Sequence, residues 1–177
     1  MSRNQLLCDA MKIPVSELIV KYMERLGIEF AFGMPGAHIQ PVYDSLYHSS
    51  VKTVLAKHEQ GAAFMACGCT RASGRISACI TTAGPGAPKP VTGIANAYAD
   101  RQPVLERTDY LANVLNLASK VLLSPNSGPV LLCLPFNVQQ ELVDADLLDS
   151  VVTEQPDPAA SENTRAIDAL TGLILEA

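Results

Sequence analysis

Hydrophobic positions along the chain alternate between helical spacing and short continuous runs. Apolar residues recur at helical spacing from Val15 to Leu26, and Gly27 follows where a helix cap belongs. The same spacing predicts further helices at about 39–47, 59–73, 91–99 and 107–123. Short apolar runs predict strands at 28–32, 51–56, 76–82, 102–105 and 129–134. This alternation predicts an α/β fold with a parallel sheet covered by helices on both faces.

The pattern changes after Phe136. Residues 141–160 are rich in acidic side chains and contain Pro156 and Pro158, which favours a polar linker. Ser161 is the first residue of a segment that can cap a final helix over 161–177. We therefore expect one sizeable domain over 1–140, a linker over 141–160 and a C-terminal helix.

Composition excludes several classes of partner. The net charge of −5 leaves no surplus of positive charge for a phosphate backbone, so no nucleic acid is expected. No run approaches the ~18 apolar residues of a membrane span, and the first ten residues lack the order of a signal peptide, so a cytoplasmic location is expected. The five cysteines lack metal-ligand spacing and are predicted to be buried free thiols. They are Cys8, Cys67, Cys69, Cys79 and Cys133.

Three loops with candidate chemistry follow three of the predicted strands. They are Gly33-Met34-Pro35-Gly36, Lys57-His58-Glu59 and Ala83-Gly84-Pro85-Gly86. The carboxyl ends of parallel strands meet at one edge of a sheet, so the three loops can converge on one ligand. Each loop alone is also compatible with a tight turn, and Glu59 alone with a solvated helix start. The residues after Glu59 are small and apolar, which favours close packing there.

Together with Ala95-Asn96-Ala97-Tyr98-Ala99-Asp100, these motifs resemble the pyrimidine-binding domain of thiamine-diphosphate enzymes, in the acetolactate synthase and pyruvate oxidase group. The resemblance extends over about 13–146. It implies thiamine diphosphate as cofactor and a 2-keto acid such as pyruvate as substrate. It also implies that magnesium is held by a separate domain with a Gly-Asp-Gly motif, which these 177 residues lack. A homo-oligomer or a partner chain would then complete the site.

The resemblance also implies roles for individual residues. Glu59 matches the catalytic glutamate that hydrogen-bonds a ring nitrogen of the aminopyrimidine, and a poorly solvated carboxylate with raised proton affinity suits that role. The other residues implied to bind the cofactor are Pro35, Gly36, Thr82, Gly84, Pro85 and Gly86. His38 and His58 are interpreted as structural. The alanine-rich helices are expected to meet a neighbouring subunit through Ala62, Ala63, Ala66, Ala95, Ala97 and Ala99.

The chain departs from the family pattern at identifiable places. Pro88-Lys89-Pro90 stands where the family usually has Thr-Asn-Leu, and an internal stretch of the domain is missing near 105–106. Residues 161–177 would be the start of a truncated central domain. Two hypotheses remain: the N-terminal portion of an acetolactate-synthase-like enzyme, or a noncatalytic remnant or dimerising module of the same fold. A flavodoxin-like nucleotide binder is disfavoured because the chain lacks a phosphate-loop lysine motif.

Overall fold

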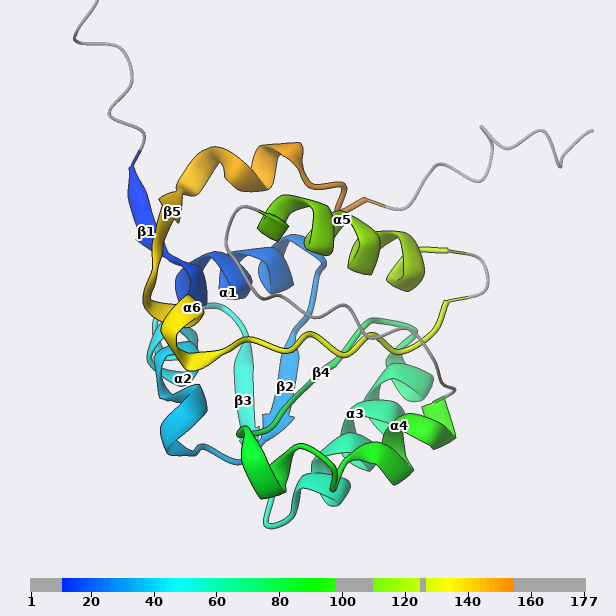
Figure 1. The fold of residues 1–177 in the computed structure, drawn as a ribbon. Helices are drawn as coiled ribbons and strands as arrows, with labels where there is room; N and C mark the ends of the chain where they lie inside the picture. Colours follow the sequence, from blue (N-terminus) through cyan, green and yellow to red (C-terminus); the bar gives the residue numbers. More distant parts are fainter. Residues whose placement is uncertain (1–10, 98–109, 125–126, 155–177) are drawn as a thin grey trace, which may run out of the picture.

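The computed structural model describes residues 11–97, 110–124 and 127–154 (Figure 1). The helices are α1 (Val15–Arg25), α2 (Gln40–Tyr47), α3 (Glu59–Ser73), α4 (Val91–Ala97), α5 (Leu111–Leu122) and α6 (Phe136–Gln140). The strands are β1 (Lys12–Pro14), β2 (Phe30–Gly33), β3 (Lys52–Leu55), β4 (Ala78–Ile80) and β5 (Leu142–Asp144). Short 3₁₀ helices occupy Ala37–Ile39, Gly84–Gly86 and Ala145–Ser150.

Strand β2 is the centre of a three-stranded parallel sheet. It pairs with β3 on one side and β4 on the other, and Phe32 lies opposite Val54 and Cys79. All three strands therefore end at the same edge, at Gly33, Leu55 and Ile80. The predicted α/β fold, and the placement of the three loops on one edge, are confirmed.

Successive side chains of β2 enter two different apolar clusters, as the alternation of a strand requires. Ala31 belongs to the large cluster that includes α1, whereas Phe32 packs with Ala56, Ala62 and Ala66. Figure 1 shows α3 and α4 lying together beside the sheet. The α3 alanines are buried inside this chain, so the expectation that Ala62, Ala63 and Ala66 meet a neighbouring subunit is wrong. The side chains of Ala97 and Ala99 lie outside the described residues.

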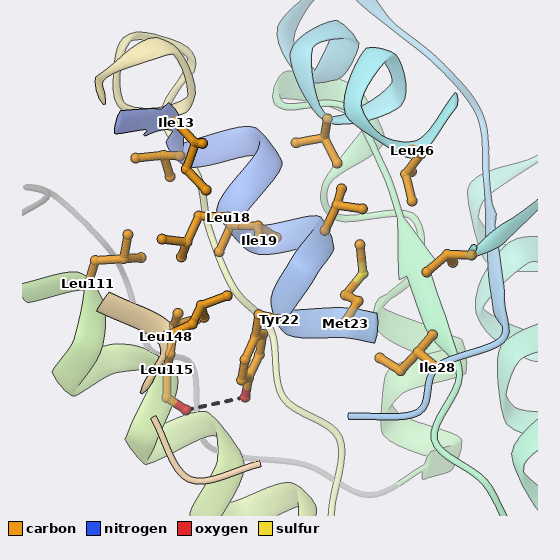
Figure 2. Packing of buried hydrophobic residues seen from close by; sticks show 14 of the residues in the cluster. Ile13, Leu18, Ile19, Tyr22, Met23, Ile28, Leu46, Leu111, Leu115 and Leu148 are labelled. Atoms are coloured by element: carbon orange, nitrogen blue, oxygen red, sulfur yellow. Dashed lines mark hydrogen bonds between the residues drawn. The ribbon is translucent and has the colours of Figure 1, made fainter. Parts of the chain in front are cut away.

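The large core is organised around α1. Its inward residues pack against α2, α5 and the C-terminal 3₁₀ helix, as Figure 2 shows for Leu18, Leu115 and Leu148. One polar link crosses this core. The Tyr22 hydroxyl donates to the Leu115 carbonyl at 3.2 Å and shares a hydrogen bond with Ser119 Oγ at 2.9 Å. Because every polar atom of this link has a partner, burying the hydroxyl costs little. The link fixes α5 against α1.

The segment after α6 is part of this core, so the prediction of a linker beginning at 141 is wrong for residues 142–151. Strand β5 pairs antiparallel with β1, and Val143 lies opposite Ile13. Val143, Leu148 and Val151 are buried, while the aspartates between them face solvent. Acidic composition masked an alternating pattern whose apolar half is inward. Residues 155–177, which include the predicted final helix, lie outside the described residues, and the division into domains stays a prediction.

Two further predictions need correction. Residues 129–134 form no strand; only Cys133 makes an isolated bridge, and Leu132 and Leu134 pack on the core through their side chains. An apolar extended segment needs a neighbouring strand to become part of a sheet, and periodicity alone does not provide one. The described cysteines are free, but none is buried: Cys67 and Cys69 are half-buried, and Cys79 and Cys133 are exposed.

Some predicted features lie outside the described residues: Cys8, the strand at 102–105 and the start of the helix at 107–109. The helices predicted at 15–26 and 59–73 are confirmed, the second with the same bounds. Within the described part of the chain, no helix has both the length and the apolar character needed to cross a membrane.

Two leucines of α5 test how this helix docks. Leu115 is fully buried, whereas Leu117 is 47% exposed. Leu115→Ala is expected to lower the free energy of unfolding by about 2–5 kcal/mol, because it leaves a cavity between α5 and α1. Leu117→Ala is expected to change it by less than about 0.5 kcal/mol. Urea denaturation measures both, and equal losses would contradict the docking of α5 described above.

Candidate functional site

The first turn of α3 places Glu59 at the edge where the strands end. Strand β3 stops at Leu55, and the Ala56 N–H donates to the Gly33 carbonyl at 2.8 Å, which holds this loop against β2. His58 caps the helix, because its Nδ1 accepts from the Gln60 N–H at 3.2 Å. The structural interpretation of His58 is thereby confirmed.

His38 also makes a structural contact. Its ring packs edge-on against Phe136 at 6.3 Å between centroids, and its carbonyl accepts from the Gln139 side-chain N–H at 2.8 Å. These contacts join the loop after β2 to α6. They agree with the structural interpretation of His38.

The Glu59 carboxylate is almost completely buried, with 3% of the residue exposed. Its Oε2 accepts no hydrogen bond from the described residues. The nearest cation is the Lys89 ammonium, whose Nζ lies 3.4 Å from Oε2 and whose side chain is half-exposed. Oε2 thus has an ion-pair partner but no hydrogen-bonded one among the described residues, which leaves it able to accept a hydrogen bond.

The pKa of Glu59 is lowered, principally by a hydrogen bond from its own backbone N–H. Lys89 and His58 lower it further, while burial acts in the opposite direction. The expectation of a raised proton affinity is therefore wrong for this state of the chain. Favourable charges at the start of α3 outweigh desolvation, as the positive end of a helix also predicts. Glu59 is ionised at neutral pH.

Glycines bring the loops after β2 and β4 against this carboxylate. A side chain at Gly86 would place its Cβ 3.1 Å from Glu59 Oε1 and 3.0 Å from Thr82 Cγ2. At Gly36, a Cβ would lie 2.8 Å from the Thr82 Cβ. A Cβ at Gly36 would therefore displace Thr82, and a Cβ at Gly86 would need its neighbours to shift by a few tenths of an ångström. The structure thus brings together Glu59, Thr82, Gly36 and Gly86 at the sheet edge.

The remaining predicted residues lie on the outer part of these loops. Pro35, Gly84 and Pro85 are exposed, and Gly84 has a φ of +82°, which glycine adopts readily. Their binding roles stay predictions.

Two residues at the edge were missed from the sequence. A sequence signal for Lys89 existed, because Pro88-Lys89-Pro90 departs from the family pattern at this position. Tyr43 had none. Its hydroxyl would lie 2.6 Å from a Cβ at Gly33, and burial raises the pKa of Tyr43 to about 12. The phenol is therefore neutral at physiological pH and can serve as a hydrogen-bond donor at this end of β2.

Two cavities lie away from the carboxylate. One of about 460 Å³ is lined by residues of α1 and α2, among them Glu17, Lys21 and Asp44. The second, of about 270 Å³, lies between α3, β4 and α4 and is lined in part by Cys67 and Cys79. Glu59 is not among the residues that line either cavity.

Comparison with known families agrees with this geometry. Residues 13–106 match the sequence model of the family described as thiamine pyrophosphate enzyme, N-terminal TPP binding domain. This chain belongs to that family. The match contains all three loops and every predicted site residue, including Glu59. The resemblance inferred from the motifs is confirmed.

Several acetolactate synthases are relatives of this thiamine-pyrophosphate family member. It is 48% identical over 93 residues to the probable acetolactate synthase large subunit of Methanocaldococcus jannaschii, covering 52% of this chain and 16% of that protein. Over 93 residues it is 44% identical to acetolactate synthase isozyme 2 large subunit of Escherichia coli, covering 52% and 17%. Isozyme 1 large subunit of Escherichia coli is 29% identical over 185 residues, covering 84% and 33%. The chain thus spans between about a sixth and a third of these relatives.

Two glycines test the close approach of the loops in this family member. Gly36→Ala is expected to destabilise the chain, because the new Cβ overlaps the Thr82 side chain. Gly68→Ala is the matched control: it is helical, exposed and without neighbours within 4 Å, so a gain of about 0.5–1 kcal/mol is expected. Thermal unfolding distinguishes the two. A stabilising Gly36→Ala would contradict the contact with Thr82.

The lowered pKa of Glu59 predicts a pH dependence of stability. A carboxyl whose pKa is lower in the folded chain than its ordinary 4.5 binds fewer protons folded than unfolded. It therefore stabilises the fold above that value, and the contribution is lost as the pH falls below about 4.5. Glu59→Gln should lose less stability than wild type between about pH 6 and about pH 3.5 in urea denaturation. Parallel losses in the two proteins would contradict the lowered pKa.

Proposed function

We propose that this chain is the N-terminal, pyrimidine-binding portion of an acetolactate-synthase-like enzyme that acts on 2-keto acids. The observation that carries the proposal is the buried carboxylate of Glu59, whose Oε2 lacks a hydrogen-bond partner among the described residues. Its place at the edge where three strands end supports the proposal, because ligands of parallel sheets bind there. Relatives named as acetolactate synthases support the reaction class.

The residues of the edge fit an aminopyrimidine. The ring offers a nitrogen that can carry a proton toward a carboxylate, and Oε2 of Glu59 is a buried acceptor with that capacity free. Gly36 and Gly86 allow the backbone to come close to this carboxylate. Pro35, Thr82, Gly84 and Pro85 would line the ring from the two flanking loops. When bound, thiamine diphosphate supplies a thiazolium carbon that attacks a keto acid and accepts electrons as carbon dioxide leaves.

In the proposed reaction, this chain controls the position of one proton, which Oε2 of Glu59 shares with the ring. The carboxylate is shielded from water, so its hydrogen bond to a ring N–H is stronger than it would be in solvent. Its lowered pKa keeps Glu59 ionised at neutral pH, which favours keeping the shared proton on the ring side. Glu59 is then a catalytic residue, and the first turn of α3 holds it in position.

Other parts of the enzyme belong to the proposal. The stretch matched in isozyme 1 has 185 residues and is longer than this 177-residue chain, so it includes positions with no residue here. This supports an internal deletion, which we place near 105–106. The finer architecture, a sheet covered by helices on both faces over 1–140, and the start of a central domain at 161–177, are proposed on the same resemblance.

Magnesium, the diphosphate site and the second half of the active site would come from a partner chain or another copy. Phe64 and Met65 are exposed on α3 and offer apolar surface for such an association. A cytoplasmic location remains part of the prediction.

A noncatalytic role of the same fold is the second candidate. It is favoured by one observation: the ammonium of Lys89 already lies at Oε2, where the ring nitrogen would bind. The following experiment distinguishes the two candidates.

Reconstitution tests Glu59 directly. The chain is combined with a relative's large subunit whose own matching glutamate has been replaced, and hydrogen–deuterium exchange at the thiazolium carbon is followed by NMR. Wild type is expected to accelerate exchange, and Glu59→Gln is expected to slow it ~10²–10⁴-fold while retaining cofactor binding. Glu17→Gln is the control, because the Glu17 side chain lies in part in solvent on the outer side of α1, and it should leave exchange unchanged. Equal rates for wild type and Glu59→Gln would remove Glu59 from the mechanism, and no exchange with either would favour the noncatalytic role.

A further inference from the structure

Among the ion pairs of the described residues, only the pair of Lys89 with Glu59 has a buried acidic partner. The Glu59 side chain is 4% exposed, whereas the acidic partners of the surface pairs, such as Glu17 with Lys21, are largely in solvent. The Lys89 ammonium reaches Oε2 from a side chain that remains 44% exposed. It therefore approaches the carboxylate from the solvent side, which is also the side from which a ligand must come.

The backbone around Lys89 is held on both sides. The Val91 N–H donates to the Pro88 carbonyl at 3.2 Å, and the Ile94 N–H donates to the Pro90 carbonyl at 2.9 Å. Pro90 is buried, and each proline has a fixed φ. The backbone position of Lys89 is thus set by the start of α4, while its long side chain is free to change rotamer. The ammonium can leave the carboxylate without unfolding the loop.

The contact satisfies Glu59 only in part. At 3.4 Å the ammonium neutralises charge, yet Oε2 still lacks a hydrogen bond from the described residues. A ring N–H at ordinary hydrogen-bond length would satisfy the same oxygen better. Because only 4% of the Glu59 side chain is exposed, both donors must reach Oε2 through the same small opening. They are competitors for it.

We infer that Lys89 is an internal competitor of the cofactor: its ammonium covers Oε2 of Glu59 in the free chain, and an aminopyrimidine must displace it to bind. This inference rests on the proposed function. Lys89 is then a residue that sets affinity and specificity through Glu59. It disfavours rings that only accept hydrogen bonds, since these cannot replace a cation at an ionised carboxylate, and it admits rings that donate an N–H.

The competition has a measurable consequence. A chain whose binding-competent state is only partly populated has an apparent dissociation constant raised by that fraction. Removing the Lys89 charge should therefore tighten binding of a free aminopyrimidine by about 1.5- to 5-fold, the range expected for a partly exposed ion pair. Lys89→Met keeps the length of the side chain and removes its charge. Lys89→Arg keeps a charge and should bind no more tightly than wild type.

The experiment is an NMR titration of the full chain with 4-amino-2-methylpyrimidine, at a pH low enough to protonate its ring nitrogen while Glu59 stays ionised. Lys21→Met is the matched control, because Lys21 is also 44% exposed and paired at 3.5 Å, but with an exposed glutamate in α1. The expected result is tighter binding by Lys89→Met alone. In the absence of any ligand, a carbon-detected titration of the Glu59 carboxyl should give a higher pKa in Lys89→Met than in wild type, because the Lys89 ammonium that helps to lower this pKa is removed.

The outcomes separate the two levels of the proposal. If wild type binds the pyrimidine and Lys89→Met binds equally or more weakly, the competition is overturned and the proposed function stands. If neither binds, the proposed function is overturned and the competition with it, whatever the ligand-free titration gives. Tighter binding by both Lys89→Met and Lys21→Met would also overturn the competition, because the effect would then reflect net charge.

Discussion

The parallel pairing of β2 between β3 and β4 is the constraint on which the described site depends. Parallel strands end at one edge, and this alone brings residues from three separate loops together. The approach is close enough that Gly36 and Gly86 have no room for a side chain. Glu59 then begins a helix directly behind the second loop, so the carboxylate is buried by the same geometry that assembles its surroundings.

Opposing effects act on the pKa of that carboxylate. Burial favours the neutral acid, whereas its own amide, Lys89 and His58 favour the anion, and the anion prevails. A ligand that displaces Lys89 removes one of the favourable terms and must replace it. The chemistry of Glu59 is therefore set by the loop before α4 as well as by α3 itself, although Lys89 lies 30 positions after Glu59 in the chain.

Much of the edge was predictable, because local signals coincide with the tertiary structure there. The bounds of α3 followed from the spacing of small and apolar residues over 59–73, and β2 from an apolar run that ends at Gly33. The sequence could not show which segments pair or pack with one another. Residues 129–134 have strand composition but form only a single bridge, at Cys133, in the described part of the chain, whereas Val143 pairs with Ile13. The proton affinity of Glu59 was mispredicted because the hydrogen bond from its own backbone N–H and the approach of Lys89 are visible only in three dimensions.

The pairing of β1 with β5 joins the two ends of the described chain. Ile13 and Val143 lie opposite one another although 130 residues separate them, and Val138, Leu148 and Val151 complete the core around α1. During synthesis the N-terminal segment leaves the ribosome long before these partners exist. Part of the apolar face of helix α1 therefore stays uncovered until these partners are synthesised. Closing the long loop between β1 and β5 is also slow. The segment shared with the family is in this sense not a self-sufficient folding unit, because its first helix is completed by residues that lie beyond it.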